Sequence, residues 1–114
     1  MRYEPNIDWS VDYELTDFGR RRLQKYKERG IPEGRTRLYE SVSASFLEGL
    51  DRGESAKELR ESLMFATAHL STKEENFRLI DTVFHNILVG GLIARVETVT
   101  ELPSAFKADF GQYE

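Results

Sequence analysis

From residue 9 onward, apolar and polar residues alternate, a pattern typical of a half-buried strand. Its apolar positions are Trp9, Val11, Tyr13 and Leu15, and we expect a strand over residues 9–15. Residues 92–100 are rich in β-branched side chains, which predicts a second strand. An isolated strand exposes unpaired backbone groups along both edges. We therefore expect the two strands to pair with each other in an antiparallel sheet.

Between these strands the apolar positions recur with the helical period of about 3.6 residues. The pattern predicts four helices, at about residues 17–29, 35–51, 55–70 and 72–89. In the first helix, Phe18, Leu23 and Tyr26 are expected to face inward. The predicted fold class is mainly α with a small two-stranded antiparallel sheet, in the order β-α-α-α-α-β.

Residues at the helix ends support these boundaries. Thr16 is a suitable N-cap for the first helix, and Gly30 a suitable stop. Ser55 with Glu58 and Ser71 with Glu74 have the spacing of capping boxes for the third and fourth helices. On the third helix, Met64 and Phe65 lie off the main apolar face. Either this helix breaks after Leu63 or it buries a second face.

The length of 114 residues suits one domain. We expect a flexible N-terminus over residues 1–8, a single domain over 9–103 and a tail over 104–114. The absence of cysteine excludes disulfides and thiolate metal sites and is compatible with a reducing compartment. No apolar run approaches the roughly 20 residues of a membrane span, and the N-terminus lacks a signal core. These features predict a cytoplasmic protein without a membrane partner.

The net charge of −4 is unevenly distributed. Residues 17–37 contain 8 basic and 3 acidic residues, a net charge of +5, so the rest of the chain carries −9. Such a stripe indicates either an anionic partner or a match with the protein's own carboxylates. Arg21, Lys25 and Arg29 recur every four residues and form one helical row. The candidate nucleic-acid-binding residues in this segment are Arg20, Arg21, Arg22, Lys25, Arg29, Arg35 and Arg37.

Two stretches resemble parts of a winged-helix DNA-binding domain. Residues 35–97 contain LDRGE, SAKELRESL, STKEENF and LVGGLIARVE, similar to three helices followed by the first wing strand. Residues 9–23, WSVDYELTDFGRRRL, resemble the last wing strand and its following helix, although here they precede the other elements. The resemblance implies that the N-terminal strand takes the last wing strand's place. An unrelated small helical fold with a two-stranded sheet is the alternative.

The resemblance also implies that the helix over residues 72–89 reads DNA, with Lys73, Arg78 and Thr82 as contact residues. The residue pattern opposes this role. Glu74, Glu75 and Asp81 are expected on the same outward face, and carboxylates repel a phosphate backbone. DNA docking through the N-terminal helix, or a protein contact, suits the charges better.

Met64 and Phe65 are candidates for a homodimer interface, because an apolar pair that the main helical face cannot bury needs another partner. The other reading places them in the core of a connecting segment. Under the first reading the protein is a homodimer.

The sequence contains no motif of an enzyme. It lacks a Gly-x-Ser-x-Gly elbow, a P-loop and a Gly-x-Gly-x-x-Gly turn. Asp81 and His85 share one helix face, but this spacing alone does not make a metal site. We expect neither catalysis nor a cofactor nor a metal. The expected function is a small transcription-regulator-like protein that binds duplex DNA, and the alternative is a protein-protein interaction adaptor that binds no nucleic acid.

Overall fold

The structure is a computed structural model that describes residues 7–96. It is mainly helical with one small sheet, and its element order β-α-α-α-α-β confirms the prediction. The elements are β1 (Tyr13–Leu15), α1 (Asp17–Arg29), α2 (Arg37–Asp51), α3 (Ala56–Thr67), α4 (Lys73–Val89) and β2 (Ile93–Arg95). The expectations for residues 1–6 and 97–114, including the tail over 104–114, lie outside the described residues.

The two strands pair as predicted, in an antiparallel ladder that sets Tyr13 opposite Arg95 and Leu15 opposite Ile93. The first strand is shorter than the expected 9–15. Asp8 accepts a hydrogen bond from the backbone N–H of Ser10 at 3.0 Å, which turns the chain before the ladder begins. The strand prediction was therefore wrong for residues 9–12. Of the predicted 92–100, the structure describes β2 up to Arg95.

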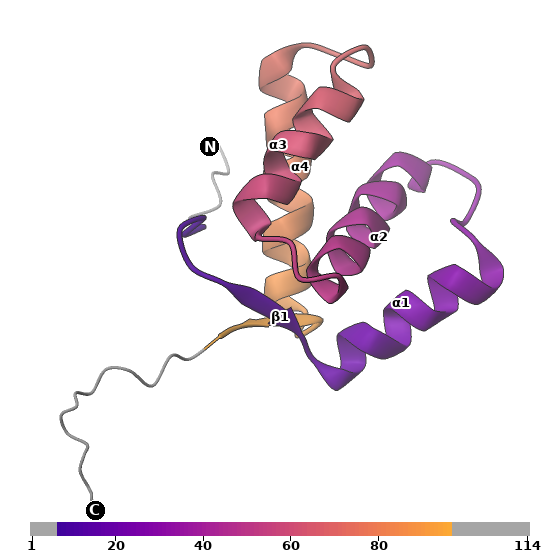
Figure 1. Cartoon of the computed structure of the whole chain (residues 1–114). Coiled ribbons are helices and arrows are strands. Elements are labelled where there is room, and N and C mark those ends of the chain that lie inside the picture. The colour runs from indigo at the N-terminus through magenta and orange to yellow at the C-terminus, as the bar shows by residue number, and fades with distance from the viewer. Residues whose placement is uncertain (1–6, 97–114) are drawn as a thin grey trace, which may run out of the picture.

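Helix α2 lies at the centre of the molecule, between α1 on one side and the α3–α4 pair on the other (Figure 1). It also contacts β1. The core between α2 and α4 contains five apolar side chains that are fully buried. These are Phe46, Leu47, Ile80, Val83 and Phe84. Trp9 covers one end of this core, with its ring centroid 4.7 Å from that of Phe84.

The N-terminal helix caps agree with the sequence at two of the three predicted sites. The side chains of Thr16 and Ser55 cap α1 and α3, and Ser55 forms the full capping box with Glu58. At α4 the N-cap is Thr72, whose hydroxyl accepts from the N–H of Glu75 at 3.1 Å. The predicted cap, Ser71, instead donates its hydroxyl to the Glu75 carboxylate, so the Ser71 capping box was wrong by one residue.

The predicted apolar faces of two helices, α1 and α3, are narrower than expected. Phe18, predicted to face inward, is 44% exposed, because α1 packs chiefly against α2 and β1 and they cover only a narrow stripe of it. Leu70 lies beyond the end of α3 at Thr67 and is 48% exposed. Helix α3 does not break after Leu63 but continues to Thr67. Off its main apolar face, Met64 is half-buried and packs against the core, whereas Phe65 is 87% exposed.

Within residues 7–96, no helix combines the length and the apolar character needed to cross a membrane.

Candidate nucleic-acid interface

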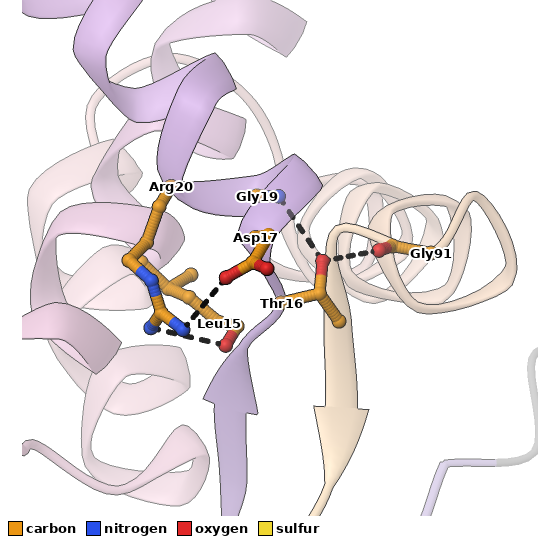
Figure 2. A network of polar contacts seen from close by, with 6 residues as sticks. All are labelled: Leu15, Thr16, Asp17, Gly19, Arg20 and Gly91. Atoms are coloured by element: carbon orange, nitrogen blue, oxygen red, sulfur yellow. Dashed lines mark hydrogen bonds and ion pairs between the residues drawn. The ribbon is translucent and has the colours of Figure 1, made fainter.

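Thr16 joins β1 and α1 to the turn between α4 and β2 (Figure 2). Its hydroxyl accepts from the N–H of Gly19 at 3.1 Å and donates to the carbonyl of Gly91 at 2.5 Å. Its backbone N–H donates to the carbonyl of Leu92 at 3.0 Å. One residue therefore caps α1 and fixes the start of that helix against a turn 75 residues away in the chain.

Gly19 allows α1 to approach this turn closely. A Cβ atom at this position would lie 1.9 Å from the carbonyl oxygen of Leu92. Arg20 completes the junction by donating to the carbonyl of Leu15 and pairing with Asp17, both at 3.3 Å (Figure 2). The two stretches that resemble winged-helix motifs, residues 9–23 and the Gly-Gly turn before β2, therefore meet in space.

One exposed face of α1, which we call the α1 cationic face, combines one aromatic ring with four cations. It consists of Phe18, Arg21, Arg22, Lys25 and Arg29. The guanidinium carbons of Arg21 and Arg22 lie 6.0 and 5.7 Å from the centre of the Phe18 ring. Arg22 is half-buried, because it lies between Phe18 and Tyr26 on the helical wheel and its aliphatic stem can cover aromatic surface. The other three cations are exposed.

Some cations of residues 17–37 form ion pairs with the protein's own carboxylates, and others do not. Arg20 pairs with Asp17, and Arg37 pairs with Glu33 at 2.7 Å. In contrast, no carboxylate among residues 7–96 lies within ion-pair distance of the row formed by Arg21, Lys25 and Arg29. Arg35 is also exposed, in the turn before α2. Among the described residues, the row therefore has no internal counter-ion.

The C-terminal end of the α1 cationic face opens into a pocket of about 360 Å³. Arg22, Lys25 and Arg29 line this pocket together with Tyr26 and one carboxylate, Glu40. The Tyr26 hydroxyl donates a hydrogen bond to Glu40. Burial raises the pKa of the Tyr26 phenol, and the hydrogen bond to Glu40 raises this pKa further. Tyr26 therefore stays protonated near neutral pH, when the pocket has three cations along its wall.

The exposed face of α4 is nearly balanced in charge. Lys73 and Arg78 are exposed, as are Glu74 and Glu75, and Thr82 is half-buried. Asp81 does not face outward as predicted, because the guanidinium group of a neighbouring helix holds its carboxylate in two hydrogen bonds of 2.8 and 2.9 Å. The electrostatic objection to α4 as a DNA-reading helix is therefore weaker than the sequence predicts, but α4 gains no cationic excess.

The partner of Asp81 is Arg60 of α3, a residue that no motif or period in the sequence marks as functional. Its guanidinium group lies between two aromatic rings, 4.8 Å from the centre of Trp9 and 4.6 Å from that of Phe77. The Asp81 hydrogen bonds raise the pKa of Arg60. The 21-residue separation of the pair gives no periodic signal, so only the packed structure reveals it.

Phe65 lies beside a second pocket, of about 380 Å³, at the connected ends of α3 and α4. The pocket is lined by Met64, Phe65, Ala68, Lys73 and Asn76. The predicted dimer residues and one predicted DNA-contact residue, Lys73, thus lie together, on the other side of α2 from α1 (Figure 1).

Comparison of the chain with known protein families, with curated proteins and with solved structures gives no match. Among residues 7–96, no three histidine or carboxylate side chains are grouped so that they could hold a metal ion.

Proposed function

We propose that this chain is a small winged-helix-like protein that binds nucleic acid through the α1 cationic face, with duplex DNA as the ligand and a role like that of a transcription regulator. The observation that carries the proposal is the row of Arg21, Lys25 and Arg29, which is exposed and has no carboxylate partner among the described residues. Like charges one turn apart destabilise a helix by a few tenths of a kcal/mol per pair. An anionic ligand offsets this cost.

The aromatic component of the face also supports a nucleic-acid ligand. Phe18 is 44% exposed beside the guanidinium groups of Arg21 and Arg22. Arginine hydrogen-bonds to phosphate in a planar, two-pronged geometry, and an exposed ring offers a surface for apolar contact with sugar or base. Backbone contacts of this kind bind DNA without reading its sequence.

The contact between the two motif-bearing stretches supports a winged-helix-like arrangement. Thr16 and Gly19 touch Gly91 and Leu92, and β1 pairs with β2. In such an arrangement β1 stands where the last wing strand is expected, and α1 follows it. Docking through α1 suits the charges better than docking through α4, whose exposed face combines Lys73 and Arg78 with two glutamates.

Fluorescence anisotropy with a labelled random duplex at about 50 and 200 mM salt tests the proposal. Each lost phosphate contact lowers the slope of log K against log salt by about 0.9. The combined Arg21→Gln, Lys25→Gln and Arg29→Gln variant should therefore bind more weakly, with a slope smaller by about 2 to 3. Its melting temperature should stay the same or rise, because the repulsion within the row is removed.

A matched variant removes the same charge from other surfaces. Lys27, Lys57 and Arg95 are exposed and lie outside the α1 cationic face. The combined Lys27→Gln, Lys57→Gln and Arg95→Gln variant should keep most of the affinity. Equal losses in both variants would mean that only net charge matters, and absence of binding by the unmodified protein at low salt would refute the proposal in favour of an interaction adaptor.

A further inference from the structure

Phe65 is the most exposed large apolar side chain among residues 7–96, at 87%. The pocket beside it has a volume of about 380 Å³ and a largely apolar wall formed by Met64, Phe65 and Ala68. An apolar cavity of about 150 Å³ is large enough to hold benzene. The pocket therefore has room for a phenyl ring from outside.

The pocket is held in shape by Asn76, which is only 3% exposed. Its amide group donates to the carbonyl of Thr67 at 2.8 Å and to that of Ser71 at 3.3 Å. These bonds fix the connection between α3 and α4 at the end of the pair that points away from the sheet (Figure 1). The apolar wall and the pocket are thus formed before any partner binds, which lowers the ordering cost of binding.

Opposite charges lie on the two sides of Phe65. Glu61 is exposed one helical turn earlier on the same face of α3. Lys73, at the start of α4, lies toward the opposite end of the patch and lines the pocket. A surface with a carboxylate, an apolar residue and an ammonium group in this order is complementary to itself when rotated by a two-fold axis.

The geometry points to a second copy of this chain as the occupant of the pocket. Phe65 of each copy inserts into the pocket of the other copy. The two α3 helices are antiparallel, and Glu61 of each copy faces Lys73 of the other. This exchange buries an apolar side chain that a monomer leaves in water, and it places one ion pair at each end of the contact.

The interface does not rest on the proposed DNA-binding function. The patch and the α1 cationic face lie on opposite sides of α2 (Figure 1). A dimer formed through α3 therefore keeps both α1 faces free. Its test is done without nucleic acid, so its failure and the failure of DNA binding are separate results.

Sedimentation equilibrium of the full chain from about 1 to 200 μM measures the association. The unmodified protein should dimerise, and Phe65→Glu should raise the dimer Kd by about 100-fold, because a carboxylate replaces a buried ring. Far-UV circular dichroism of this variant should be unchanged. The matched control is Val89→Glu, at a side chain that is 71% exposed at the other end of α4 and should leave the Kd unchanged.

Charge exchange tests the two-fold arrangement itself. Glu61→Lys places two ammonium groups opposite each other, and Lys73→Glu places two carboxylates opposite each other, so each variant alone should raise the dimer Kd about three- to tenfold. An equimolar mixture of the two variants should form a mixed dimer with the original Kd, because both ion pairs are then present, one of them with its two charges exchanged. Absence of this rescue would overturn the antiparallel arrangement.

Two other outcomes would overturn the proposal. The first is an unmodified chain that is still monomeric at the highest concentration, about 200 μM. The second is dimerisation that Phe65→Glu leaves unchanged. If the full chain is a monomer and removal of residues 104–114 makes it dimerise, the occupant is the chain's own C-terminal segment, which contains Phe106 and Phe110.

Discussion

Replacing Gly19 by alanine should destabilise the protein, although helix propensity alone predicts the opposite. Gly19 lies in the first turn of α1 and its backbone is helical. In a helix, alanine is more favourable than glycine by up to about 1 kcal/mol. The packing reverses this preference, because the added Cβ would lie 1.9 Å from the carbonyl oxygen of Leu92 and 2.9 Å from its carbonyl carbon.

The size of the effect follows from the contacts that must move. Ordinary contact begins at about 3.4 Å, so α1 or the turn must shift by about 1.5 Å. Such a shift breaks the two hydrogen bonds of Thr16 to Gly91 and Leu92, which are 2.5 and 3.0 Å long. Two hydrogen bonds and disturbed packing around Leu92 amount to about 2 to 4 kcal/mol. This loss corresponds to a decrease in melting temperature of about 8 to 17 °C for a domain of this size.

Urea unfolding monitored by the single tryptophan, Trp9, provides the assay. Two further glycines give a graded comparison. Gly49→Ala should cost less, because its Cβ meets the flexible side chain of Leu59 at 2.1 Å. Gly90→Ala should be close to neutral, with the nearest contacts at 3.0 and 3.3 Å. A Gly19→Ala protein as stable as the unmodified chain would show that α1 does not touch the turn before β2.

Two other contacts give predictions with direct readouts. Arg60→Met should lower the free energy of unfolding by about 2 kcal/mol, because Asp81 loses its partner and the rings of Trp9 and Phe77 lose the cation. A double-mutant cycle with Asp81→Asn measures the coupling, and additive effects would contradict the pairing. Asn76→Ala should cost about 1 to 2 kcal/mol, because the carbonyl of Ser71 loses its side-chain donor and that of Thr67 keeps only the N–H of Leu70. Hydrogen exchange should then become faster mainly in residues 67–73, and a uniform change along the chain would contradict a local role.

The order and type of the elements could be predicted from the sequence because each depends on local pattern. Alternation marked β1, and the helical period marked four helices. Thr16, Ser55 and Gly30 are caps with a chemical reason that does not depend on the rest of the fold. The pairing of β1 with β2 followed from the need of two isolated strands to satisfy their edges.

Side-chain exposure was harder to predict, since it depends on how much of each helix its neighbours cover. Phe18 has the right period for the inner face of α1 but lies at the edge of the covered stripe and is 44% exposed. Leu70 continues the period of α3 after the helix has ended at Thr67. The amide of Asn76 binds the carbonyl of Thr67 across nine residues, a contact that periodicity does not encode.

The sequence predicted the positive charge of the candidate site but not which of its cations pair with carboxylates of the same chain. The sequence identified the row of Arg21, Lys25 and Arg29, and could not distinguish free cations from cations paired with the protein's own carboxylates. Among the described residues, Arg20 and Arg37 form ion pairs with carboxylates three and four residues away in the chain. The row of Arg21, Lys25 and Arg29 has no such ion pair with a described carboxylate. The outward face predicted for Asp81 was wrong because Arg60, 21 residues earlier, draws that carboxylate toward α3.

The direction of the α1 cationic face depends on the far end of the described chain. Thr16 fixes the start of α1 to the carbonyls of Gly91 and Leu92, and Gly19 lets the helix lie against that turn. Because the sheet and these hydrogen bonds hold the first turn of α1, the row that begins at Arg21 has a defined orientation relative to β2. A ligand that binds the row therefore meets a surface positioned by residues some 70 positions later in the sequence, and a change at the Gly-Gly turn alters that surface without touching any cation.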